Sequence, residues 1–89
     1  MKKIIAIFLL LSFSPSLAFA QQISASSAKR IALKDAGVTS KSIRDYDLDI
    51  DRENGRKVYE IDFKYKGREY DYKIDANSGK ILRKNVERD

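Results

Sequence analysis

Residues 57–75, KVYEIDFKYKGREYDYKID, alternate between apolar and charged side chains and break step only at Lys66-Gly67. Successive side chains of a β-strand point to opposite faces of a sheet. The stretch therefore predicts two antiparallel strands, 57–65 and 68–75, joined by a tight turn. One face of this hairpin is apolar and is expected to form the core, while the other face is charged.

A third strand precedes this hairpin, because apolar residues alternate with aspartates at positions 45–51. Asn54-Gly55 is a strong signal for a two-residue type I′ turn. With both turns in place, apolar residues face one another throughout: Ile50 with Tyr59, Leu48 with Ile61, Tyr46 with Phe63, Phe63 with Tyr70, Ile61 with Tyr72 and Tyr59 with Ile74. A shift of one residue would scatter them over both faces.

A helix is predicted before the strands, with Ser24 as its N-cap and Gly37 at its end. Four alanines fall on one stripe that can approach the sheet closely: Ala25, Ala28, Ala32 and Ala36. The fold class is therefore α+β, with one N-terminal helix packed on a three-stranded antiparallel meander. A fourth strand at 80–86 stays open, because pairing Ile81 with Ile74 would turn Leu82 toward the charged face.

The first twenty residues, MKKIIAIFLLLSFSPSLAFA, have the pattern of a secretory signal peptide. A basic start is followed by an apolar run and by Ala18-Phe19-Ala20, a typical cleavage site. The run is too short to span a bilayer, which needs about 20 apolar residues. We therefore expect residues 1–20 to be a cleaved signal peptide and residues 21–89 to be one periplasmic or secreted domain without a membrane span.

The expected mature chain is small and only weakly basic. It has 69 residues, with 16 basic and 13 acidic side chains, which gives a net charge of +3. It has no cysteine, so the core must stabilise the domain without disulfides. The nearly balanced charge and the expected export argue against nucleic acid as a partner.

The predicted register brings three carboxylates together on the charged face: those of Asp47, Asp62 and Asp71, one from each strand. Like charges directly opposite one another destabilise a sheet. The rows on either side each contain a lysine, and this row contains none: Asp45–Lys64–Glu69 and Asp49–Glu60–Lys73. The three aspartates are candidate calcium ligands, because Ca²⁺ takes oxygen ligands. Alternatively, the row contacts a basic patch on a protein partner, or it is merely a solvated surface.

The sequence offers little for catalysis. It has no histidine and no cysteine, which excludes Ser-His and Cys-His nucleophiles and the usual His/Cys metal sites. No glycine-rich phosphate loop precedes a helix. Paired carboxylates would need a cleft, for which so small a domain has little room. We expect no enzymatic activity and no bound cofactor.

Three segments carry a family resemblance: ISASSAKRIALKDAG at 23–37, VYEI at 58–61 and YKIDANSGKIL at 72–82. With these segments, residues 23–82 resemble the PepSY domain, which occurs in propeptides of secreted peptidases and in small exported bacterial proteins. The resemblance implies an exported, non-catalytic binding or regulatory module. Inhibition of a secreted peptidase is the usual suggestion, and envelope sensing is another role.

If that role holds, the partner is another exported or membrane protein, either a peptidase or a sensor kinase. The resemblance carries no catalytic residue over to this chain. A cation-responsive periplasmic protein that uses the acidic row is the alternative function.

Overall fold

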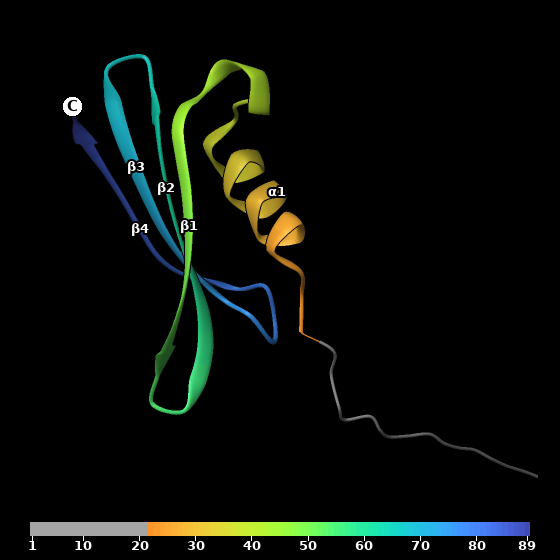
Figure 1. Ribbon diagram of the computed structural model, residues 1–89. Helices are drawn as coiled ribbons and strands as arrows, with labels where there is room; N and C mark the ends of the chain where they lie inside the picture. The colour runs from red at the N-terminus through yellow and green to blue at the C-terminus, as the bar shows by residue number, and fades with distance from the viewer. Residues whose placement is uncertain (1–21) are drawn as a thin grey trace, which may run out of the picture.

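The computed structural model describes residues 22–89. Helix α1 (Ala25–Ala36) and a short 3₁₀ helix (Ser40–Ser42) precede four strands: β1 (Arg44–Glu53), β2 (Arg56–Tyr65), β3 (Arg68–Asp75) and β4 (Ile81–Arg88). The strands form one antiparallel sheet in the order β1-β2-β3-β4, and α1 lies on one of its faces (Figure 1). The α+β prediction is confirmed, and the predicted signal peptide, 1–20, lies outside the described residues.

Helix α1 begins and ends where the sequence predicts. The Ser24 hydroxyl accepts a hydrogen bond from the backbone N–H of Ser27 at 3.1 Å. Gly37 has a φ of 73°, in the left-handed region that glycine adopts at low cost. Ala28 and Ala32 are fully buried against the sheet, whereas Ala25 is exposed. The buried stripe therefore starts one turn later than predicted.

The two hairpin turns hold the predicted register over most of the sheet. Asn54 and Gly55 have φ values of 54° and 76°, as a type I′ turn requires. Five of the six predicted apolar pairs form: Ile50 with Tyr59, Leu48 with Ile61, Phe63 with Tyr70, Ile61 with Tyr72 and Tyr59 with Ile74.

The predicted pairing of Tyr46 with Phe63 is wrong, because β1 contains a bulge between Arg44 and Asp47. Asp45 has a φ of 54°, a left-handed conformation that inserts an extra residue into the strand. As a result, Arg44 and not Asp45 lies opposite Lys64.

The open question about residues 80–86 is resolved in favour of a fourth strand. Ile81 pairs with Ile74 as considered, and a bulge follows, so that Lys73 pairs with Arg83. Leu82 lies at this bulge and is 39% exposed. The extra residue restores the alternation, and Lys84 then reaches the helix side, where its Nζ lies 2.8 Å from Asp35 Oδ2.

The core lies between α1 and the middle of the sheet. Its largest fully buried side chains on this face are those of Phe63, Ile61 and Ile74. Ile50 was expected in the core but is 59% exposed. It lies near the end of β1 that leads into the β1–β2 turn, and this hairpin extends beyond the helix (Figure 1).

Candidate functional site

We use the term open face for the side of the sheet opposite α1. The alternation of the strands places sixteen side chains there: Asp47, Asp49, Asp51, Glu53, Arg56, Val58, Glu60, Asp62, Lys64, Glu69, Asp71, Lys73, Asp75, Arg83, Asn85 and Glu87. All but two of them are charged, and no helix covers this face among the described residues. It is therefore the surface to search for a functional site.

The predicted acidic row forms at the centre of the open face. Asp47 lies opposite Asp62, and Asp62 lies opposite Asp71. The structure adds Asn85 of β4 to the row, opposite Asp71. Within residues 22–89, no cationic group lies within 4.0 Å of any of the three carboxylates.

This arrangement favours a proton on the row. Hydrogen bonding with the Asp71 carboxyl raises the pKa of Asp62 to about 7, with smaller contributions from burial and from the charges of Asp71, Glu69 and Asp47. The cause is physical, because two facing carboxylates without a cation between them cannot both ionise cheaply.

The lysines of the open face bind carboxylates outside the row. Lys73 forms a close ion pair with Glu53 and lies 4.0 Å from Glu60. The ammonium group of Lys64 lies 3.8 Å from Asp45 and 3.4 Å from Asp89. Both lysines therefore neutralise acidic groups beside the row and leave its own charge uncompensated.

A shallow hollow of about 180 Å³ lies beside the row and is lined by Glu60, Asp62, Asp71, Tyr72, Lys73 and Arg83. The charged side chains that line the hollow include both acidic and basic residues. In the described chain, a group of three carboxylates whose oxygens all lie within 4.8 Å of one another occurs in a neighbouring set, Asp51, Glu53 and Glu60. Calcium binding by the acidic row remains the alternative that the sequence left open.

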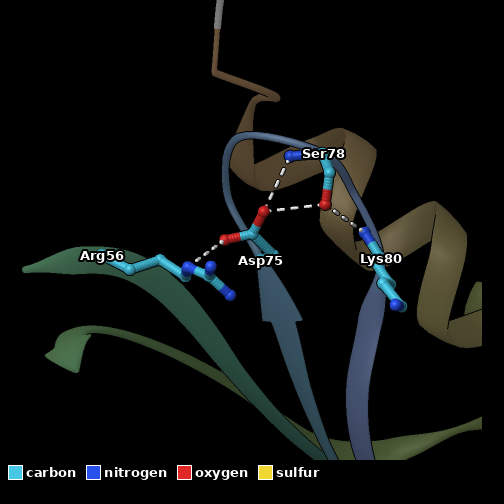
Figure 2. Close-up of polar contacts among 4 residues, drawn as sticks. All are labelled: Arg56, Asp75, Ser78 and Lys80. Atoms are coloured by element: carbon cyan, nitrogen blue, oxygen red, sulfur yellow. Dashed lines mark hydrogen bonds and ion pairs between the residues drawn. The ribbon is translucent and has the colours of Figure 1, made fainter. Parts of the chain in front are cut away.

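A second polar cluster, around Asp75, was not singled out in the sequence. Asp75 ends β3 and is only 6% exposed. Its Oδ2 accepts hydrogen bonds from the Ser78 backbone N–H at 3.0 Å and from the Ser78 hydroxyl at 2.7 Å (Figure 2). The Ser78 hydroxyl oxygen in turn accepts from the backbone N–H of Lys80 at 3.1 Å. These bonds close the loop between β3 and β4.

Arg56 of β2 covers the other carboxylate oxygen of Asp75, with Nε 3.5 Å from Oδ1 (Figure 2). Hydrogen bonding from Ser78, chiefly, and the charge of Arg56 hold the pKa of Asp75 below its usual value against the opposing effect of burial. The Asp-x-x-Ser spacing was a local signal for such a turn. The contact with Arg56 had no signal in the sequence.

A third cluster ties α1 to the last two strands. The Tyr72 hydroxyl donates to Asp35 Oδ2 at 2.8 Å, and Lys84 Nζ lies 2.8 Å from the same oxygen. Lys84 and then Tyr72 lower the pKa of Asp35, while burial and the bond to Asp35 raise that of Tyr72. The cluster is structural, since it joins three elements around one carboxylate.

A profile of the PepSY family, described as "Peptidase propeptide and YPEB domain", matches residues 22–85. The chain belongs to this family. The match to PepSY runs from the start of α1 into β4, so it includes the open face and the Asp75 loop. PepSY domains are propeptide-like or inhibitory modules, are generally non-catalytic and occur in exported proteins.

The PepSY chain is also similar to "Uncharacterized protein Spy1430" of Streptococcus pyogenes serotype M6, with 48% identity over 66 residues. The aligned segment covers 74% of this chain and 51% of the relative, so the chain matches about half of the relative's length. No solved structure matches the sequence. In the described part of the chain, no helix is both long and apolar enough to cross a membrane.

Proposed function

We propose that this PepSY chain is an exported, non-catalytic module that binds and restrains a secreted peptidase. The observation that carries the proposal is the extent of the match, since residues 22–85 make up nearly all of the described chain. Residues 22–89 contain one helix and one sheet and no second unit that could be the peptidase. In this proposal the peptidase is a separate exported protein, so the module acts on it in trans.

We place the contact on the open face. The opposite face of the sheet is occupied by α1 and the buried core. The open face presents three carboxylates without a cationic neighbour among the described residues, those of Asp47, Asp62 and Asp71. A basic patch on the peptidase would complement this row and favour the encounter.

Export is part of the proposal. Residues 1–20 would be removed as a signal peptide, and the domain would work in the periplasm or outside the cell. The intact mass of the protein from that fraction should correspond to a chain that starts at Gln21. Uncleaved protein in the membrane fraction would contradict this part. A sensor kinase of the envelope is the alternative partner.

The binding test uses the exported protein as bait in an extract of exported proteins from its own source. We expect a peptidase, identified by mass spectrometry, whose activity falls when the purified protein is added. Asp62→Lys should weaken both capture and inhibition, because it places a positive charge at the centre of the row, where a basic patch would be repelled.

Lys34→Glu is the matched control, since it also reverses one exposed charge but lies on the outer side of α1. It should leave capture unchanged. If no exported peptidase is captured or inhibited, the proposed function is wrong. If inhibition occurs and Asp62→Lys leaves it unchanged, the function stands and the open face is the wrong surface.

A further inference from the structure

Strand β4 is poorly matched in charge to the strand beside it. It pairs with β3 along one side, and its other side is an open edge among the described residues (Figure 1). Three of its residues lie directly opposite a residue of the same charge: Arg83 opposite Lys73, Glu87 opposite Glu69 and Arg88 opposite Arg68. Like charges in this position destabilise a sheet. Within β4, the Asn85 amide donates a hydrogen bond to Glu87 Oε2 at 2.9 Å, but β4 offers these residues no opposite charge within 4.0 Å.

None of these three residues has a partner of opposite charge within 4.0 Å in the described chain. No carboxylate lies within 4.0 Å of Arg83, and no cationic group lies within 4.0 Å of Glu87. They cannot reach one another, because four residues of an extended strand span about 13 Å. Both project on the open face, with Asn85 midway between them.

This spacing makes the edge of β4 self-complementary. If two β4 strands pair antiparallel about Asn85, each Arg83 lies directly opposite the Glu87 of the other copy. The like-charged pairs Arg83–Lys73 and Glu87–Glu69 then each gain an opposite charge on their outer side, whereas Arg88 lies opposite Leu82. Lys84 would lie opposite Val86 on the other face, so this register brings no two lysines together.

We propose that a second copy of this chain docks along β4, so that the two sheets join into one eight-stranded sheet about a two-fold axis at Asn85. The pairing is β-strand addition, in which the main chains supply hydrogen bonds and the side chains supply specificity. The contact is closed, because each copy uses the same edge. It does not depend on the proposed peptidase binding.

The other edge of the sheet cannot serve a second copy in this way. On the open face, β1 presents Asp47, Asp49 and Asp51 in succession. Pairing two β1 strands would place carboxylates against carboxylates. Pairing β1 with the β4 of another copy would leave one free edge at each end and would form open chains of molecules. The charge pattern of β4 favours the closed dimer.

The test is sedimentation of the protein produced from the full sequence, over a range of concentrations at low and at high salt. We expect a monomer–dimer equilibrium that weakens at high salt, since a contact of one strand edge is small and depends on charge. Arg83→Glu should raise the dimer dissociation constant by about tenfold or more, because it creates two repulsive pairs. The double variant Arg83→Glu with Glu87→Arg should restore dimerisation, because it reverses both charges.

The stability of dilute monomer separates this effect from misfolding. In Arg83→Glu the introduced carboxylate lies opposite Lys73, so the melting temperature of the monomer should stay equal or rise. Asp49→Lys, on the opposite edge, should leave the dimer unchanged. A protein that stays monomeric at all concentrations, species larger than dimers, or a double variant that fails to restore the dimer would each overturn the proposal.

Discussion

Asp62 on β2 lies directly opposite Asp71 on β3, and the two carboxyl groups are within hydrogen-bonding reach of one another. The pair lies between Asp47 on one side and Asn85 on the other. Of the two residues that flank the pair, Asp47 adds negative charge and Asn85 adds no charge. The folded domain therefore holds a proton on this pair that the unfolded chain releases at lower pH.

The first prediction concerns stability against pH. The pKa of Asp62 is raised from 3.8 in the unfolded chain to about 7 in the fold, so the folded state binds more protons between these values. Stability from this group is therefore complete below pH 4 and is lost as pH rises through about 7. Melting curves should show the wild type more stable at about pH 5 than at about pH 8, by roughly 1 kcal/mol after solvent screening.

Asp62→Asn should remove most of this pH dependence, because the amide cannot ionise but keeps nearly the same shape. Asp49→Asn, one row away on the same face, should leave the dependence as in the wild type. The lowered pKa values of Asp35 and Asp75 act in the opposite direction, with stability lost as pH falls below about 4. A wild type that is equally stable at both pH values would contradict the prediction.

The second prediction concerns calcium. Millimolar calcium should leave the melting temperature of the wild type unchanged, since Lys73 and Arg83 line the hollow beside the row and repel a cation. A ligand that binds only the folded state raises stability with its concentration. A rise with calcium that Asp62→Asn abolishes would instead support the cation-responsive function.

The third prediction concerns the loop between β3 and β4. Asp75→Ala should lower the melting temperature by several degrees, because it removes two acceptor contacts to Ser78 and the carboxylate that faces Arg56. Ser78→Ala should have a smaller effect, since it removes only the hydroxyl bonds. Asp51→Ala, an exposed carboxylate of the same sheet, is the control and should change little. Equal melting temperatures for all three variants would show that the loop does not depend on Asp75.

The fourth prediction concerns the contact between α1 and the sheet. Ala32 is fully buried, so Ala32→Leu should overpack the core and cost about 1–3 kcal/mol of unfolding free energy. Lys34→Leu, on the exposed side of the same helix, should change stability little. Denaturant unfolding of both variants gives the comparison. If both positions accept leucine equally, α1 does not pack as described.

Most of the sheet could be predicted because two independent signals agree. The Asn54-Gly55 turn and the strict alternation of side chains allow only one register that keeps the apolar residues on one face. The acidic row at Asp62 follows from that register without further information. The helix boundaries follow from Ser24 and Gly37, whose chemistry is local.

The features that could not be predicted depend on departures from alternation or on contacts distant in sequence. The bulge at Asp45 rests on one aspartate in a left-handed conformation, which the residue tolerates but does not require. The bulge at Leu82 sets the faces of β4 and has no turn residue to mark it. The ion pair of Asp75 with Arg56 joins residues that only the completed β2–β3 pairing brings together.

The two ends of the described chain form backbone hydrogen bonds at opposite ends of β3. Ile23 donates its backbone N–H to the carbonyl of Ala76, just after β3, at 2.7 Å. Asp89 donates to the carbonyl of Gly67, just before β3, at 2.8 Å. A pulling force applied through these ends would therefore run parallel to the strands. It would strain all the hydrogen bonds between β3 and β4 at the same time, in shear, and would not break them one after another. The domain should resist stretching between its ends better than its size alone would indicate.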